Sequence, residues 1–230
     1  MNKIYLIYKK LLKEYSYQGW WPVLDFKGKS SMNEKYTRGY HPKDYSFPRN
    51  EKERFEIIIG AVLTQNTAWL NVQKALLNLE KLNAINPEKL LSLGKNVIRE
   101  AIKPAGYFNQ KSEYLVNITK FFQSLKGKCP KREELMQVKG VGNETADSIL
   151  LYAYSQPHFV VDAYTKRIFR HLGILKGNET YSEIKALFEE RLPKNMEIYQ
   201  EYHALIVEHT KNYYKKRPYK DELLNAFRGK

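Results

Sequence analysis

The chain has little cysteine, no long hydrophobic run and too few acidic residues to balance its basic ones. Its 230 residues include one cysteine, Cys129, so no intramolecular disulfide can form, and we interpret this residue as small and partly buried. No apolar run approaches the roughly 20 residues needed to cross a bilayer. The first five residues also lack the apolar stretch and cleavage site of a signal peptide. These absences predict a soluble, cytoplasmic protein with no membrane partner.

The shortage of acidic residues leaves a strongly basic chain. There are 39 lysines and arginines against 25 aspartates and glutamates, a formal net charge of +14. Such a positive field attracts a polyanion and speeds its encounter. Ribosomal, membrane-surface and merely soluble proteins share this property, so charge alone does not identify a nucleic-acid enzyme.

Hydrophobic periodicity predicts an all-α fold. Apolar residues at helical spacing mark one face of residues 4–15 and one face of residues 55–63. Proline and glycine separate the further helical segments, which are expected at 68–82, 87–93, 96–102, 109–125, 131–136, 144–155, 163–172, 179–191 and 195–214. Residues 25–50 show no such period and are expected to form a long irregular loop.

The most informative segment runs from residue 135 to residue 172. Within it, Val138 begins a turn that carries Gly140 and Gly142, followed by small residues such as Thr145 on a predicted helix. Glycine permits positive φ and close backbone approach. Amides of such a turn, at a helix N-terminus, form an anion site suited to a DNA phosphate. Twenty residues after Gly142, an apolar, strand-like approach brings Asp162 to the start of another helix.

This pattern resembles the helix-hairpin-helix DNA glycosylases of the endonuclease III superfamily. Residues 19–22, 60–67, 103–111 and 202–208 resemble in particular the small 3-methyladenine DNA glycosylases of endonuclease III type. The resemblance implies two helical domains with a cleft between them. Residues 51–155 would form a six-helix domain with the hairpin, and residues 1–50 and 156–230 a second domain built from both ends of the chain.

The resemblance also implies site residues. Asp162 would stabilise positive charge on the sugar as the N-glycosidic bond breaks, and would orient or deprotonate water. On its position alone, Asp162 is better explained as a helix N-cap, and the resemblance reverses that judgement; the two roles can hold together. Trp20 and Trp69 would sandwich the flipped base, with Trp21 and Pro22 supporting the pocket wall. Indole faces favour a cationic, alkylated purine, although tryptophans also serve as core residues.

DNA contacts are expected on the hairpin side. Gln65 would enter the gap left by the flipped base, or it is an ordinary polar residue at a helix end. The hairpin residues expected to bind duplex DNA are Val138, Gly140, Gly142 and Thr145. Basic side chains on helices usually form a solvated face. The weaker candidates for phosphate contacts are therefore Lys111, Lys166, Arg167 and Arg170.

Glu144 occupies the position where strand-cutting relatives carry the lysine that forms a Schiff base. A carboxylate cannot form an imine, so the sequence predicts a glycosylase without lyase activity, although Lys139 lies nearby. The ordinary alternative for Glu144 is an acid favoured by the helix dipole. A single cysteine also cannot supply the four-cysteine iron–sulfur loop of many relatives. We expect no cofactor and no metal.

The predicted function is therefore that of a monomeric, monofunctional base-excision DNA glycosylase acting on duplex DNA with a damaged base. An alkylated purine such as 3-methyladenine is the favoured substrate. Uracil and 8-oxoguanine stay open as alternatives, since Leu205 replaces a lysine that the best-known small 3-methyladenine glycosylases carry near the pocket. A non-catalytic helix-hairpin-helix DNA-binding protein is a second class. His203 and Glu208 are either polar groups at the pocket or residues of a surface helix, and we favour the surface helix.

Overall fold

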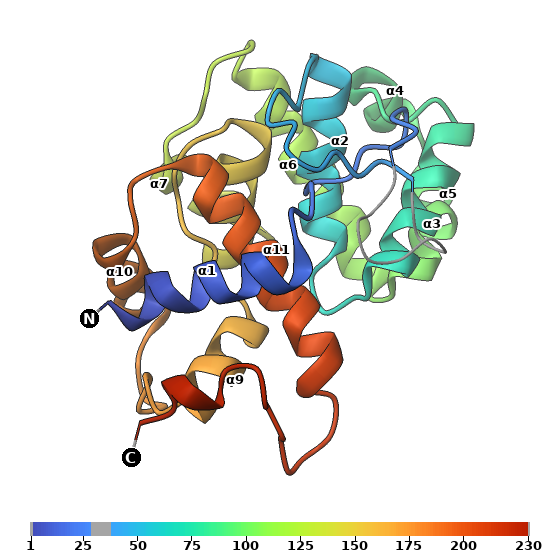
Figure 1. Cartoon of the computed structure of the whole chain (residues 1–230). Helices are drawn as coiled ribbons and strands as arrows, with labels where there is room; N and C mark the ends of the chain where they lie inside the picture. The colour runs from blue at the N-terminus through green and yellow to red at the C-terminus, as the bar shows by residue number, and fades with distance from the viewer. Residues whose placement is uncertain (1, 29–37, 230) are drawn as a thin grey trace.

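The computed structural model describes residues 2–28 and 38–229 (Figure 1). All secondary-structure elements assigned within these two ranges are helices, which confirms the all-α prediction. The α-helices are α1 (Lys3–Tyr15), α2 (Glu51–Leu63), α3 (Trp69–Lys81), α4 (Pro87–Ser92), α5 (Lys95–Ile102), α6 (Phe108–Ser124), α7 (Arg132–Met136), α8 (Asn143–Ser148), α9 (Ala163–His171), α10 (Tyr181–Arg191) and α11 (Met196–Tyr213). Shorter turns are η2 (Lys103–Ala105), the π-helical η3 (Ile149–Ala153) and η4 (Asn225–Phe227). None of the described helices is long and apolar enough to cross a membrane.

Polar N-caps fix where several helices begin. The side chains of Asn50, Asn86 and Asn195 each accept the backbone N–H three residues further on, at the starts of α2, α4 and α11. Thr180 and Glu183 form a reciprocal capping box at α10. Each cap satisfies a backbone donor that the helix leaves free, and contributes about 1 kcal/mol. The observed boundaries consequently lie close to those predicted from the sequence.

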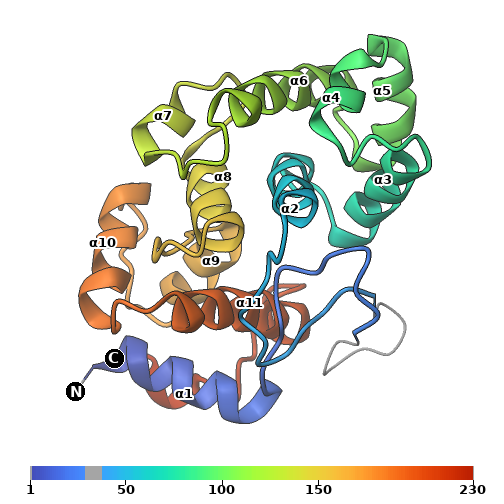
Figure 2. The same ribbon diagram turned by 90° about the horizontal axis from the view of Figure 1, so that it is seen from above.

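Helix α2 lies at the centre of the larger group of helices (Figure 2). Residues 55–63 are all buried, whereas the sequence predicted a single apolar face. The prediction was wrong because α3, α6, α8 and η3 pack against α2 from several sides. Gly60 also lets the segment that carries Trp21 approach α2 closely, since a Cβ there would lie 3.2 Å from the Nε1 atom of Trp21.

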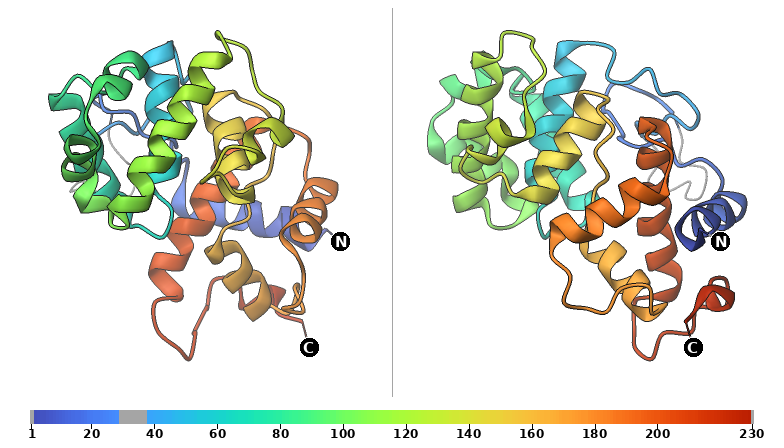
Figure 3. Two further views of the ribbon diagram at one scale, coloured as in Figure 1. Left: turned by 180° about the vertical axis from the view of Figure 1, so that it is seen from behind. Right: turned by 90° about the vertical axis from the view of Figure 1, so that its left-hand side faces the viewer.

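The second group of helices is assembled from both ends of the chain. Helix α1 packs along α11, which also contacts α9, and α10 contacts α1 (Figure 3). The Tyr202 hydroxyl on α11 donates to the Ile4 carbonyl at 2.8 Å, and Lys3 Nζ donates to Phe227 O at 3.4 Å. The division into a domain of residues 51–155 and a domain of residues 1–50 plus 156–230 stays a proposal. The first of these spans contains seven α-helices, α2 to α8.

A buried carboxylate joins the hairpin helices to α10. Asp147 of α8 is fully buried and accepts hydrogen bonds from Arg132 Nε at 2.9 Å, Tyr181 Oη at 2.8 Å and Lys185 Nζ at 2.9 Å. A buried charge is tolerated when it is paired and fully hydrogen-bonded. This cluster therefore fixes α7 and α8 relative to α10.

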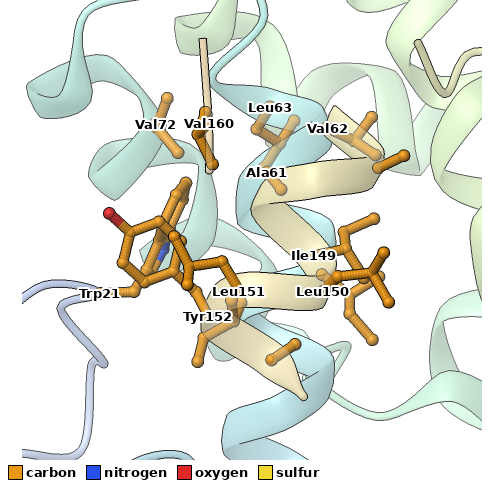
Figure 4. Packing of buried hydrophobic residues seen from close by; sticks show 14 of the residues in the cluster. Trp21, Ala61, Val62, Leu63, Val72, Ile149, Leu150, Leu151, Tyr152 and Val160 are labelled. Carbon is orange, nitrogen blue, oxygen red and sulfur yellow. The ribbon is translucent and has the colours of Figure 1, made fainter. Parts of the chain in front are cut away.

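The chain segment between η3 and α9 delivers Asp162 to the space between the two groups. Residues 159–161 are buried and belong to no helix or strand. Close to them, Figure 4 shows Trp21 and Tyr152 beside the buried side chains of α2 and η3. The aspartate is thus carried by a segment that the core holds on both sides.

The predicted irregular loop contains no helix or strand in its described part, residues 25–28 and 38–50. Residues 29–37 of this prediction lie outside the described residues. His41 anchors the loop, because its Nε2 lies 2.8 Å from Trp21 O and its Nδ1 lies 2.7 Å from Asp44 O. Its ring also stacks on Phe47 at 4.1 Å. The loop therefore supports the segment that carries the tryptophans.

Cys129 is exposed, and the prediction of a partly buried residue was wrong. It lies in the connection between α6 and α7, two residues after Gly127, which adopts a φ of +81°. The chain has left the core at this point, so few side chains cover the thiol.

Candidate active site

A small pocket of about 140 Å³ brings the predicted site residues together. Its lining includes Trp20, Trp21, Pro22, Trp69 and Asp162. Pockets for drug-sized ligands usually start at about 300 Å³. A space of this size suits one planar ring system rather than a whole nucleotide.

Asp162 combines a structural role with a position in the pocket. Its Oδ1 accepts hydrogen bonds from the Thr165 backbone N–H at 2.7 Å and from the Thr165 hydroxyl at 2.8 Å, which caps α9. Its Oδ2 lies 3.6 Å from Nε2 of His203. Burial raises the pKa of Asp162, but the His203 ring and the two Thr165 bonds outweigh it, so the pKa lies below its ordinary value. The carboxylate is therefore ionised at neutral pH.

His203 is buried and faces Asp162, so its interpretation as a surface residue was wrong. Its Nδ1 lies 2.8 Å from the hydroxyl oxygen of Tyr152, a fully buried residue of η3. The same hydroxyl donates to the Gln200 carbonyl of α11 at 3.3 Å. Tyr152 thus orients His203, and His203 orients Asp162. No sequence pattern indicated this role for Tyr152, which stands in an unbroken apolar run.

The three tryptophans have different surroundings. Trp21 is 5% exposed and packs edge-to-face against Trp69, with ring centroids 5.5 Å apart, and against Tyr152 at 5.2 Å. Trp20 and Trp69 are only half-buried, and both line the pocket. The Trp20 ring meets the His203 ring edge-on at 5.6 Å. Trp21 is therefore a core residue behind the wall, while the other two present ring surface to the pocket.

A second buried acid holds the segment that leads to Trp20. Glu201 of α11 accepts the Gln18 backbone N–H at 2.8 Å and the Tyr45 hydroxyl at 3.3 Å. Burial raises the pKa of this carboxyl. Helix α11 consequently positions both sides of the pocket, with Glu201 on the tryptophan side and His203 on the aspartate side.

Glu144 lies at the mouth of the pocket, where the pocket meets a groove of about 750 Å³ that Glu144 also lines. The residue is exposed. Even so, the protein around its carboxyl and the negative charge of Asp162 raise the pKa of Glu144 to about 7, against opposing effects of His203 and Lys166. One pocket is therefore lined by two carboxyl groups, one with a raised pKa and one with a lowered pKa.

The two hairpin glycines have different structural needs. Gly140 has a φ of +100°, and a Cβ there would lie 2.2 Å from Cγ of Tyr114, so no other residue fits. Gly142 has a φ of −99°, and its Cβ would meet nothing within 4 Å. Both glycines line the large groove, whereas Val138 packs against the core and is not part of its lining. The fold therefore requires Gly140, and Gly142 leaves the groove open.

Gln65 is attached to the hairpin. Its side-chain amide donates to the Gly140 carbonyl at 2.8 Å and to the Thr145 hydroxyl at 2.9 Å. The residue lines the large groove next to Asn66, which is exposed with a φ of +52°. The predicted wedge and the predicted phosphate anchor are thus in direct contact.

Three of the four basic candidates line a second groove of about 740 Å³ beside α9. Its charged lining residues are all basic and comprise Lys166, Arg167, Arg170, Arg217 and Arg228. Arg167 also lines the hairpin groove, so the two grooves are adjacent. The fourth candidate, Lys111, is different. It is buried, with Nζ donating to Leu63 O at 2.8 Å and to Thr67 Oγ1 at 2.7 Å. Lys111 caps the end of α2 and cannot reach a phosphate.

Across residues 2–28 and 38–229, no group of three or more histidine, cysteine, aspartate or glutamate side chains could hold a metal ion.

The chain is similar to known DNA repair proteins. The family model described as HhH-GPD superfamily base excision DNA repair protein matches residues 59–194. A putative DNA repair glycosylase of Methanocaldococcus jannaschii is 41% identical over 225 residues, which cover 93% of this chain and 90% of that protein. Endonuclease III of Thermotoga maritima is 32% identical over 154 residues, 65% of this chain and 71% of that one.

Solved structures show the same fold. The H. pylori 3-methyladenine DNA glycosylase bound to 1,N6-ethenoadenine is 26% identical, with a TM-score of 0.68 over 92% of this chain and 98% of that chain. A non-covalent endonuclease III–DNA complex, 19% identical, has a TM-score of 0.70 over 93% and 87%. Since the family model spans more than half of the chain, and the Methanocaldococcus relative nearly all of it, the chain belongs to the HhH-GPD superfamily of base excision DNA repair proteins, as an endonuclease III-like DNA glycosylase.

Proposed function

We propose that this glycosylase is monofunctional and removes an alkylated purine, such as 3-methyladenine, from duplex DNA. The observation that carries the proposal is the meeting of an ionised aspartate and two half-buried indoles, Trp20 and Trp69, in one pocket of base size. The H. pylori relative, named for 3-methyladenine, supports the same substrate class.

The chemistry follows from the charge of the substrate. An N-alkylated purine is a cation in DNA, so it leaves as a neutral base when the C1′–N bond breaks, without needing a proton. Electron-rich indole faces attract the cation. The positive charge then passes to the sugar, where the Asp162 carboxylate stabilises it and takes a proton from the attacking water.

The absence of a suitable amine supports hydrolysis without strand cleavage. Covalent attack on the sugar needs a lysine amine beside C1′. No lysine is among the residues that line the pocket in the described structure, and Glu144 stands at the position of the Schiff-base lysine. Lys139 is exposed, and its Nζ pairs with Glu113 at 2.7 Å.

DNA binding would follow the two adjacent grooves. We place the damaged strand along the hairpin residues Gly140, Gly142 and Thr145, with Val138 supporting the turn from the core side. Gln65 would fill the gap left by the base. The basic groove beside α9 would hold phosphates further along the duplex, since lysine and arginine supply most of the affinity for DNA. We propose that a monomer suffices, because one chain supplies the pocket and both grooves.

A panel of lesion-bearing duplexes tests the proposal. Single-turnover reactions on 3-methyladenine, 7-methylguanine, uracil and 8-oxoguanine would be analysed with and without alkali. We expect release of the methylated purines, strand breaks only after alkali, and little enzyme trapped on DNA by borohydride. Efficient trapping would show that another lysine, with Lys139 first to be tested, attacks the sugar. Preferred release of uracil or 8-oxoguanine would overturn the substrate class, and binding without release would indicate a non-catalytic protein.

A further inference from the structure

We propose that Glu144 is a second catalytic residue, which donates a proton to the departing base and so extends the activity of this pocket to neutral purines. The inference rests on the proposed glycosylase function and deepens it. A neutral purine, unlike an alkylated one, leaves as an anion unless it is protonated during the reaction. An acid in the pocket therefore decides whether such a base can be released.

The position of Glu144 fits this role. Glu144 and Asp162 are the only acidic residues among those that line the pocket in the described structure, and both also line the adjoining groove. A nucleotide whose base is in the pocket and whose backbone is in the groove would pass both carboxyl groups. Two carboxyl groups on either side of a glycosidic bond, one acid and one anion, are the usual apparatus of glycoside hydrolysis.

The surroundings of the two carboxyl groups separate their roles. Asp162 is bound by Thr165 and faces His203, which favours its ionised form. The Glu144 carboxyl has no hydrogen bond or ion pair within the described part of the chain, and its pKa is raised to about 7. Pairs of titratable groups whose environments move their pKa values apart commonly divide into acid and base.

Groups from several elements face Glu144. Asp162, at the N-cap of α9, raises its pKa, while Lys166 of α9 and His203 of α11 lower it. Tyr181 of α10 is also close enough for its phenol to be affected by Glu144, but the pKa of that phenol is far above neutral.

The proposed step is balanced in atoms and electrons. As the C1′–N9 bond breaks, its electron pair leaves with the base, and the Glu144 carboxyl transfers its proton to a ring nitrogen of that base. Asp162 stabilises the cationic sugar. Water then adds to C1′ and gives a proton to the Asp162 carboxylate. Solvent takes that proton from Asp162 and supplies one to the Glu144 carboxylate, which restores both groups. One water is consumed, and one free base and one abasic site are formed.

An ordinary first-turn acid would behave differently. In that case Glu144 only interacts with the helix dipole, and its replacement changes stability or DNA affinity equally for all substrates. A proton donor instead gives opposite pH dependences for the two kinds of base. Neutral purines need the protonated carboxyl, so their release declines above pH about 7. Cationic purines need no proton and are attracted by the carboxylate, so their release does not decline there.

The test compares Glu144→Gln with wild type on duplexes that contain 1,N6-ethenoadenine, a neutral base, or 7-methylguanine, a cationic one. Single-turnover rates would be measured from pH 5.5 to 8.5. On ethenoadenine at pH 6 we expect the variant to lose on the order of 100-fold, as is typical of a missing general acid. On 7-methylguanine we expect a change of less than about tenfold. Dividing wild-type rates by variant rates isolates the pH dependence that comes from Glu144, because all other titratable groups are the same in both proteins.

Glu133→Gln is the matched control, because Glu133 is an exposed first-turn acid of α7 that lines neither cavity. It makes the same change in net charge and should leave both rates unchanged. Glu144→Asp keeps a carboxyl and should retain the declining pH profile on ethenoadenine, which covers the case that the glutamine variant folds poorly. Equal losses on both substrates, or no release of ethenoadenine by a wild type that releases 7-methylguanine, would overturn the role of Glu144 and leave the proposed function standing. Release of neither base would overturn both.

Discussion

Replacement of Asp162 by asparagine separates its two roles. The Oδ1 of an asparagine can still accept hydrogen bonds from the N–H and hydroxyl of Thr165. Asparagine is as good an N-cap as aspartate, so the free energy of unfolding should change by less than about 1 kcal/mol. What the substitution removes is the negative charge of the second oxygen, which faces His203 and the pocket.

The size of the catalytic loss follows from that charge. A carboxylate about 4 Å from a developing cation contributes about 4 kcal/mol at the effective dielectric constant of partly buried sites. Since each 1.36 kcal/mol corresponds to about tenfold in rate, base release should fall about 10³-fold. Loss of one preorganised group in other enzymes has effects of about 10² to 10³.

Single-turnover release of 3-methyladenine, followed by alkali cleavage at the abasic site, would measure the rate. Chemical denaturation and duplex affinity would be recorded for the same preparations. Asp162→Ala is the companion variant, because it removes the charge and the cap together and should also lose about 1 kcal/mol of stability. A rate for Asp162→Asn within tenfold of wild type would refute the assignment of Asp162 as the group that stabilises the sugar.

Three further predictions test the pocket wall, the hairpin and a buried acid. Trp69→Leu keeps apolar bulk but removes the ring face, so the activation free energy for release of 3-methyladenine should rise by about 1–2 kcal/mol. The rate of release should fall by a larger factor than the affinity for duplex DNA. Equal losses of stability and activity would instead indicate a core role. Gly142→Val should fold normally, since its Cβ meets nothing within 4 Å, and should bind damaged and undamaged duplexes more weakly by gel shift; a loss of lesion discrimination alone would contradict this, and Gly140→Val should be unstable. Glu56 is buried, accepts the Leu24 N–H at 2.8 Å, and has its pKa raised by burial to about 8. The folded chain therefore keeps a proton that the unfolded chain releases above its ordinary pKa of 4.5, so stability falls as pH rises from about 4.5 to 8. Glu56→Gln should flatten that part of a urea-denaturation profile and be more stable than wild type at pH 9 by at least about 1 kcal/mol; an unchanged slope would exclude Glu56 as its cause.

Local patterns made much of the fold predictable. Helix boundaries depend on caps such as Asn50 and Asp162 and on apolar spacing, all of which lie within a few residues of each other. The hairpin glycines and the distance to Asp162 are also local features of the sequence, and the structure places this aspartate beside the predicted tryptophans.

The contacts that orient the site were not predictable in this way. His203 and Tyr152 are 51 residues apart, and each stands in a helix whose apolar neighbours conceal a polar role. A lysine on a helix is usually solvated, yet Lys111 is buried because its ammonium group donates a hydrogen bond to the carbonyl of Leu63 at the end of α2. Such roles depend on which elements meet in space, and one-dimensional periodicity carries no information about that.

The burial of Trp21 links the substrate range of this enzyme to its folding. Trp21 packs on Trp69 at the pocket and on Tyr152, which holds His203 beside Asp162. A substitution that reshapes the wall for a larger base therefore also disturbs the core and the alignment of the carboxylate. Stabilising changes elsewhere in the fold would have to come first for such a variant to remain folded. Tyr164 is exposed and lines both the pocket and the hairpin groove. We expect laboratory evolution toward bulkier lesions to proceed through such residues rather than through Trp21.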